Sequence, residues 1–96
     1  MNQIQIANDF INLINQKDYD KIYQFFTKES TLYLLNVHNE ISVEELKNFL
    51  TNNINDQLIV KRQLESNVCV KIETNQLNLY FVIKRKRIRR LELELV

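Results

Sequence analysis

Few residues in this chain of 96 could carry nucleophilic or acid–base chemistry. His38 and Cys69 are its single histidine and its single cysteine. A Cys–His nucleophile pair would need these two side chains next to each other. Cys69 falls in mid-strand on the face opposite Val68 and Val70, where a small inert side chain is the better interpretation. His38 and Glu40 could form an acid–base pair, but a solvated turn explains them more simply, so we expect no catalytic residue.

A run of positive charge occupies residues 84–90. Six of its seven residues are basic: Lys84, Arg85, Lys86, Arg87, Arg89 and Arg90. Such a run can bind a phosphate backbone, or it can be solvated or paired with Glu92 and Glu94. On a two-residue turn at Arg85-Lys86, Lys84 and Arg87 would face each other, and Arg89 and Arg90 would point to opposite faces. No aromatic residue is interleaved, so a polyanion contact remains open but nucleic acid is not the partner we expect.

A second basic residue lies where an apolar one would fit. Arg62 stands between Val60 and Leu64, on the apolar side of an expected strand. Because burial of an unpaired charge is costly, we expect Arg62 at the rim of the sheet or in an ion pair, with an anion-holding pocket as the alternative. The residues that we expect at a pocket or its rim are Arg62, Phe10, Tyr33, Tyr80 and His38.

Composition excludes several classes of function. The chain has no Gly and no Pro, so it can form neither a phosphate loop nor a dinucleotide fingerprint. One cysteine allows no internal disulfide and no cysteine-based zinc site, and we expect no metal and no cofactor. The richness in Asn and Ile indicates an AT-rich coding sequence of bacterial or phage type. Without Gly, we expect Asn to occupy the left-handed turn positions.

Charge and hydropathy indicate an ordinary soluble domain. The chain is 45% hydrophobic and 26% charged, with a net charge of +1, so nothing global attracts it to nucleic acid or to a membrane. No apolar run approaches the roughly 20 residues that span a bilayer. The N-terminus has neither the basic nor the apolar region of a signal peptide, so we expect a cytoplasmic protein.

Three helices are predicted by apolar residues at spacings of three and four. The first covers residues 3–16, and the second follows Asp18 as its cap. The third begins at the N-cap Ser42, with Glu45 completing a capping box. The expected buried faces are Ile6, Ala7, Phe10, Ile11 and Ile14; Tyr19, Ile22, Tyr23 and Phe26; and Val43, Leu46, Phe49, Leu50 and Ile54.

Strands are predicted by apolar residues at every second position. A short strand at 31–36 leads into a turn and a brief return strand. Four further strands, 58–64, 68–72, 77–83 and 88–96, form an antiparallel meander. The sequence therefore predicts one α+β domain over residues 1–96, with helices on one face of the sheet. The other face would expose apolar atoms at Ile59, Cys69, Tyr80, Val82, Ile88 and Val96, which favours a homodimer through the sheet.

Several segments together resemble the nuclear transport factor 2-like (NTF2-like) superfamily, which includes ketosteroid isomerases and SnoaL-type cyclases. Residues 10–20 resemble the first helix and its break, Tyr23-Gln24-Phe25-Phe26-Thr27 the end of the second helix, residues 41–50 the third helix, and residues 80–95 the final hairpin. The resemblance covers nearly the whole chain. It implies a cone-shaped fold in which a curved sheet wraps around the helices, a pocket in the cone, and dimers through the sheet.

The catalytic residues of the isomerases do not carry over by this resemblance. Their base would fall between Ser30 and Asn39, where this chain has no carboxylate. Their oxyanion tyrosine would fall near Phe10, and their second acid near Leu79. We therefore expect a non-catalytic module that binds a small apolar ligand or a protein partner and self-associates. The alternatives are an enzyme with non-standard residues and a weak polyanion binder acting through residues 84–90.

Overall fold

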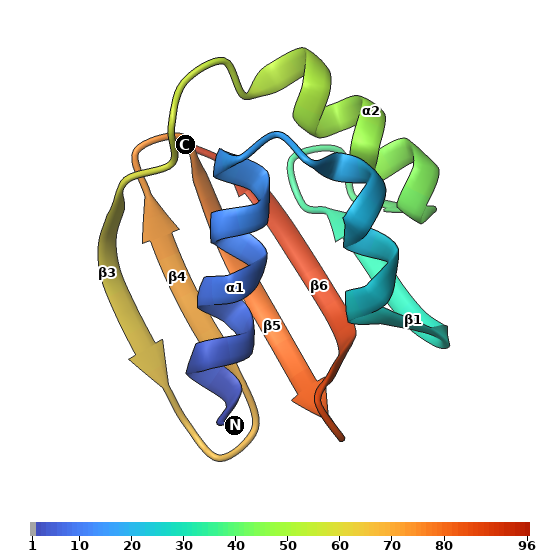
Figure 1. Cartoon of the computed structure of the whole chain (residues 1–96), viewed down its shortest axis with the longest axis vertical. Coiled ribbons are helices and arrows are strands. Elements are labelled where there is room, and N and C mark those ends of the chain that lie inside the picture. The colour runs from blue at the N-terminus through green and yellow to red at the C-terminus, as the bar shows by residue number, and fades with distance from the viewer. Residues whose placement is uncertain (1) are drawn as a thin grey trace.

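The computed structural model describes residues 2–96 and places two α-helices and one 3₁₀ helix against a six-stranded sheet (Figure 1). In chain order the elements are α1 (Gln3–Asn15), η1 (Tyr19–Phe25), β1 (Phe26–Leu34), β2 (Asn39–Ile41), α2 (Val43–Asn53), β3 (Val60–Glu65), β4 (Val70–Thr74), β5 (Leu77–Lys84) and β6 (Arg87–Leu95). The strand order is β2-β1-β6-β5-β4-β3. The meander β3–β6 is confirmed, and β1 joins it by parallel pairing with β6.

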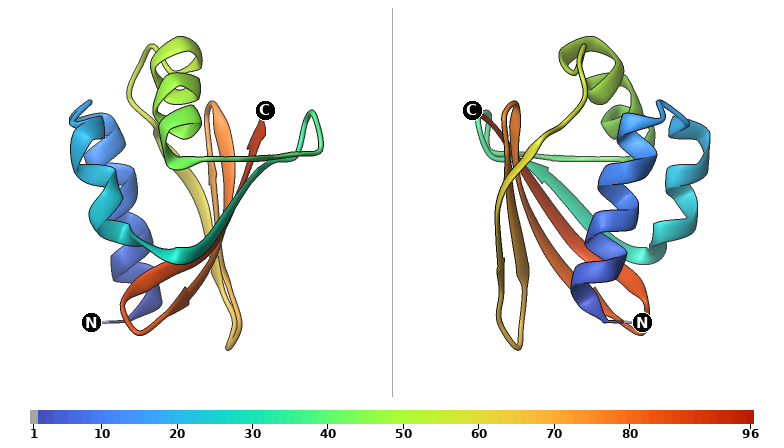
Figure 2. Two further views of the ribbon diagram at one scale, coloured as in Figure 1. Left: turned by 90° about the vertical axis from the view of Figure 1, so that its right-hand side faces the viewer. Right: turned by 60° about the vertical axis from the view of Figure 1, so that its left-hand side comes forward.

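The helices lie on one side of the curved sheet, and the opposite face is left uncovered (Figure 2). Strand register aligns Ile41, Leu32, Leu91, Phe81 and Val70 in one row on the helix side. All five are buried, so this row forms the floor of the core. The α+β class with helices in the concave face, predicted from the sequence, is confirmed.

The segment after α1 differs from the predicted second helix. It forms the 3₁₀ helix η1, and Asp18 makes no side-chain capping bond. A 3₁₀ helix has three residues per turn, so Tyr19, Ile22 and Phe25 lie on one side, and all three pack into or against the core. Phe26 is the C-cap of η1 and at the same time the first residue of β1. Tyr23, expected in the core, is 48% exposed because the tighter helix turns it outward.

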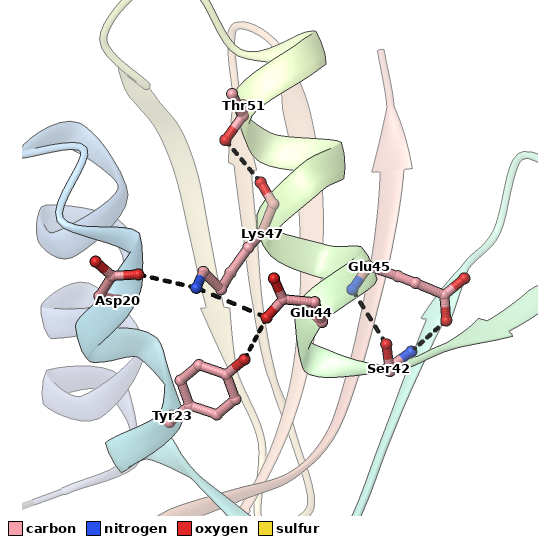
Figure 3. Close-up of polar contacts among 7 residues, drawn as sticks. All are labelled: Asp20, Tyr23, Ser42, Glu44, Glu45, Lys47 and Thr51. Atoms are coloured by element: carbon pink, nitrogen blue, oxygen red, sulfur yellow. Dashed lines mark hydrogen bonds and ion pairs between the residues drawn. The ribbon is translucent and has the colours of Figure 1, made fainter.

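The third predicted helix is confirmed in detail as α2. The backbone N–H of Glu45 donates to Ser42 Oγ over 3.1 Å, and the N–H of Ser42 donates to Glu45 Oε1 over 3.0 Å (Figure 3). These bonds satisfy two backbone donors that a helix start leaves unpaired. Leu46 and Leu50 are fully buried, so the reciprocal cap fixes where the helix starts and its apolar face fixes how it docks.

Two β-bulges reverse the side-chain alternation that the sequence predicts. In β3 the register shifts between Val60 and Arg62, which turns Leu64 to the uncovered face and leaves it 43% exposed. In β6 the register shifts opposite Val82 and Ile83, which turns Ile88 inward to full burial. The expectations of a buried Leu64 and an exposed Ile88 were therefore wrong, because one extra residue moves every following side chain to the other face.

The edge strand β3 is exposed along its whole length. Its apolar anchor, Leu58, is buried just before the strand begins. Gln63 faces α1, and its Nε2 donates to Asn8 Oδ1 over 2.9 Å. Val68, expected in a buried strand, lies in the β3–β4 turn and is 72% exposed. Lys61 and Glu65 on this edge disfavour pairing with another strand, since charged side chains blunt exposed edges.

Asn residues act in the loops through their side chains and do not take the left-handed positions. The described residues with positive φ are Lys17, His38, Arg85 and Lys86, so the expectation that Asn would take these positions was wrong. Asn15 instead accepts a hydrogen bond from the Leu58 N–H (2.7 Å) and donates to the Leu58 carbonyl (3.1 Å). The amide thus imitates a strand partner and ties the end of α1 to the approach to β3.

The cap and the core contact of α2 should differ in their contribution to stability. Ser42→Ala should lower the free energy of unfolding by roughly 1 kcal/mol, because it removes one side of the capping box. Leu50→Ala should lower it by about 2–5 kcal/mol, because it opens a cavity in the core. Urea unfolding followed by circular dichroism measures both. Equal losses would mean that the assigned start of the helix is wrong.

The β5–β6 turn should be open to stabilisation. Arg85 and Lys86 have φ of 53° and 65°, which is the two-residue turn that Asn-Gly prefers. Arg85→Asn with Lys86→Gly should raise the free energy of unfolding by roughly 1–2 kcal/mol, because a left-handed residue with a long side chain costs about this much. The control pair Arg85→Gln and Lys86→Gln removes the same charges but keeps the backbone cost. An equal gain in the control would attribute the strain to charge and contradict the backbone explanation.

Candidate functional site

An aromatic cluster fills the space where the fold brings α1, η1 and the sheet together. Phe10 is fully buried. Its ring meets those of Phe25, Phe26 and Phe81 edge to face, at centroid distances of 5.3, 5.9 and 5.8 Å. Edge-to-face pairs of this kind are favourable beyond the area that they bury. Phe10, which the sequence suggested as a pocket residue, is therefore the centre of a packed core.

A pocket of about 350 Å³ opens beside this cluster, at the end of the molecule where the β5–β6 hairpin meets the helices. Three pairs of residues line it: Ile6 and Asp9 from α1, Gln24 and Phe25 from η1, and Lys86 and Arg87 from the hairpin. Phe25 also contacts the ring of Phe10, so one wall of the pocket is the outer side of the aromatic cluster.

The polar groups of the pocket favour binding over acid–base chemistry. Lys86 and Arg87 bring two positive charges, and Asp9 brings one negative charge. The Asp9 carboxylate accepts a hydrogen bond from Gln5 Nε2 over 2.8 Å, and Arg87 donates to the Lys86 carbonyl over 3.3 Å. The wall contains no imidazole, thiol or phenol. Such a pocket can hold an anion beside an apolar surface.

The residues that could have formed a nucleophile pair lie apart. His38 is exposed in the turn between β1 and β2, at one edge of the sheet. Cys69 stands next to β4, near the other edge, and its sulfur lies 3.7 Å from Ser66 Oγ. The fold thus brings neither residue to the pocket. Arg62 is exposed in β3 opposite Glu73, so it too stands away from the pocket wall.

The two remaining candidates, Tyr33 and Tyr80, lie on the uncovered face. Strand register places them in one row that crosses all six strands, from β2 to β3: Glu40, Tyr33, Glu92, Tyr80, Lys71 and Leu64. We call this set the outer row. The Arg90 guanidinium lies 4.5 Å from the Tyr33 ring centroid, and Lys71 Nζ lies 5.2 Å from that of Tyr80. Cations over both rings make this face aromatic and charged at once.

The basic hairpin does not present one flat positive surface. All four residues from Lys84 to Arg87 are exposed, and of these Lys86 and Arg87 also line the pocket. The remaining two basic side chains, Arg89 and Arg90, do not line the pocket. Arg90 Nε donates to Glu92 Oε2 over 2.6 Å on the uncovered face, and Arg89 Nε is buried without a hydrogen-bond partner among the described residues. The charges that are contiguous in sequence are therefore divided in space.

A polar network that the sequence did not predict joins η1 to α2 (Figure 3). Lys47 Nζ lies 2.9 Å from Asp20 Oδ1 and 3.7 Å from Glu44 Oε2, and the Tyr23 hydroxyl donates to Glu44 over 2.6 Å. The Lys47 bond lowers the pKa of the Asp20 carboxyl, and the same bond raises the pKa of Lys47. The bond to Glu44 raises the pKa of the Tyr23 hydroxyl. The partners of Lys47 in this network, Asp20, Glu44 and Tyr23, are exposed, so the network orients the two elements and adds little stability.

Within residues 2–96, no group of three or more His, Cys, Asp or Glu side chains is arranged to hold a metal ion. No helix in the same range is both long and apolar enough to cross a membrane.

The sequence matches no protein-family model and no curated protein, but the structure is similar to solved structures. An NTF2-like protein of unknown function from Cytophaga hutchinsonii superposes with a TM-score of 0.76 at 11% identity, covering 100% of this chain and 91% of that chain. A de novo designed protein with a curved β-sheet gives 0.77 at 14% identity, with 100% and 88% covered.

A protein with a ketosteroid isomerase-like fold from Catenulispora acidiphila, solved in complex with trimethylamine, gives a TM-score of 0.72 at 8% identity, with 92% of this chain and 82% of that chain covered. The chain therefore has the NTF2-like fold, which confirms the fold that the resemblance implied. At these identities the likeness extends to the fold alone.

The division of the basic residues generates a prediction about nucleic acid. A labelled DNA duplex should bind weakly at low salt and lose that binding at physiological salt, because only a few phosphate contacts can form on any one side. Fluorescence anisotropy measures this. Tight binding that survives physiological salt, and that disappears when Arg85, Lys86 and Arg87 are changed to Ser, would make nucleic acid the main partner.

Proposed function

We propose that this protein is a non-catalytic interaction domain that self-associates through the uncovered face of its sheet. The observation that carries the proposal is the division between the two faces. The helix side is occupied by the buried cluster around Phe10, whereas the other side presents two tyrosines with their cations to solvent.

The described core has no titratable side chain at two of the positions where the resemblance to isomerases would place one. Phe10 and Leu79 stand near two of these positions, and both are fully buried and apolar. General acid–base catalysis needs a titratable group within hydrogen-bond reach of the reacting atom. The described core supplies Thr74 as its buried polar residue, and the Thr74 hydroxyl is held by the Leu77 carbonyl over 2.8 Å.

The size of the molecule is compatible with an interface on this face. The molecule measures 31 × 30 × 26 Å, so its broadest side projects at most about 900 Å², which is enough to contain the ~800 Å² that each partner buries in a standard interface. The face mixes aromatic, aliphatic and oppositely charged side chains, a composition typical of isologous interfaces. Val82 and Thr31 flank Arg90 in the row next to the outer row, which adds smaller side chains to the contact.

The charge order of the outer row suggests how two copies would meet. The row begins with Glu40 at β2 and ends with Lys71 and Leu64 at β4 and β3. A two-fold axis between the faces and along the strands would reverse one row over the other. With that axis passing through Glu92, Glu40 of one copy would lie over Lys71 of its partner and Tyr33 over Tyr80, while the two Glu92 carboxylates, each bonded to its own Arg90, would meet at the centre. Complementary charges of this kind fix the register of a contact more than its strength.

Self-association should be measurable by light scattering at tens of micromolar, where we expect a dimer. Tyr80→Glu should weaken the dimer by roughly 1–3 kcal/mol, because an aromatic anchor near the centre of an interface is replaced by a charge. Val68→Glu is the matched control, since Val68 is 72% exposed in the turn between β3 and β4, at the end of the sheet. A monomeric wild-type protein, or equal effects of the two variants, would contradict the proposal.

The register has its own test in the same assay. Glu40→Lys and Lys71→Glu should each weaken the dimer, because each places like charges opposite one another. An equimolar mixture of the two variants should recover it as a heterodimer, since every Lys then faces a Glu. Failure of the mixture to recover, with both single variants weakened, would exclude this register while leaving the face itself in place.

A further inference from the structure

We propose that the pocket between α1, η1 and the β5–β6 hairpin binds a small amphipathic carboxylate. The pocket holds about 350 Å³ and is lined by Ile6, Asp9, Gln24, Phe25, Lys86 and Arg87. Small-molecule sites in proteins begin near this size and combine an apolar wall with a few polar groups that fix orientation.

The apolar wall is rigid. Ile6 is 4% exposed, and Phe25 packs its ring edge to face against the fully buried Phe10. Ile6 lies one helical turn before Phe10 on the same face of α1. Both wall residues are therefore held by the core, and a ligand with an apolar body would cover a preformed surface. Covering this surface would be favoured by the hydrophobic effect, in proportion to the apolar area that is removed from water.

The polar wall selects the charge of the ligand. Lys86 and Arg87 against Asp9 give the pocket a net charge of +1, which a monoanion balances. A guanidinium can hold both oxygens of a carboxylate, and an ammonium adds a point charge beside it. Asp9 would repel a second negative charge. Asp9 would accept a hydrogen bond from a hydroxyl on the ligand, as it already does from the Gln5 amide.

The hairpin is built at a cost that a bound anion would offset. Arg85 and Lys86 both adopt left-handed backbone, and Lys84 pairs directly across the hairpin with Arg87, a destabilising like-charge pair. Positive φ alone marks no site here, since Lys17 and His38 share it. The hairpin differs from those two positions because four adjacent positive charges stand beside a pocket with an apolar wall. Local strain of this kind is retained where function uses it.

This site is independent of the proposed self-association. The pocket lies on the helix side of the sheet, whereas the outer row lies on the uncovered face. Ligand binding can therefore fail while the dimer persists, and the dimer can fail while the ligand still binds.

The experiment is an NMR titration of the ¹⁵N-labelled protein with octanoate. We expect saturable shifts that are largest at the amides of Ile6, Asp9, Gln24, Phe25, Lys86 and Arg87. Acetate has the charge without the apolar body, and octylamine has the body with the opposite charge. Each should bind at least about tenfold more weakly than octanoate, because acetate lacks the apolar contact and octylamine lacks the favourable charge interaction. Shifts of equal size for octanoate and octylamine, or octanoate shifts spread over the whole surface, would overturn the proposal.

Two matched double variants separate a pocket from a merely positive hairpin. Lys86→Gln with Arg87→Gln removes the two charges that line the pocket, and should weaken octanoate binding about tenfold or more. Lys84→Gln with Arg85→Gln removes two charges from the same hairpin but from outside the pocket, and should leave the affinity within about twofold. Unchanged spectra away from the hairpin would verify the fold of both. Equal weakening in the two variants would mean that octanoate is attracted by the positive charge of the hairpin in general, which would refute a site in the pocket.

Discussion

The packing of Phe10 against Phe25, Phe26 and Phe81 joins four elements at one point: α1, η1, β1 and β5. Each ring pair contributes roughly 0.5–1.5 kcal/mol beyond the area that it buries. Because Phe25 and Phe26 are adjacent in sequence yet both reach Phe10, the chain must pass from 3₁₀ helix to strand between them. The packing around Phe10 therefore accounts both for the conformation of η1 and for the filled space between α1 and the sheet.

Filling the interior moves the possibilities for function to the surface. With the aromatic cluster packed against α1, two surface features can serve function: the uncovered face, with its outer row of tyrosines and charges, and the pocket beside the aromatic cluster. The bulges shape the uncovered face. The bulge in β3 places Leu64 in the outer row, and the bulge in β6 buries Ile88. Had β6 continued without its bulge, Ile88 would occupy the exposed face and Arg89 would point toward the core, while Arg90 would keep its place on the outside.

The chain also demonstrates how a fold can be built without glycine. Its left-handed positions are taken by Lys, His and Arg, and its loops are held by amide side chains. Asn15 binds the backbone of Leu58. Asn36 accepts from the Leu95 N–H over 2.7 Å, and Asn75 accepts from the Ile59 N–H over 2.9 Å. These bonds join residues that are between 16 and 59 positions apart in the sequence. They therefore hold distant segments together as well as ordering the loops.

The sequence by itself determined the class of fold and most of its elements. The capping box at Ser42 and Glu45, the apolar face of α1 and the meander of four strands are local patterns, and local backbone geometry is enough to express them. Tertiary structure alone decided which face Leu64 and Ile88 occupy, because a bulge depends on pairing with another strand and leaves no mark in the alternation. It also decided that Lys86 and Arg87 meet Asp9 and Ile6 while Arg90 meets Tyr33. Residues so distant in sequence become neighbours only when helix and hairpin pack against the same core.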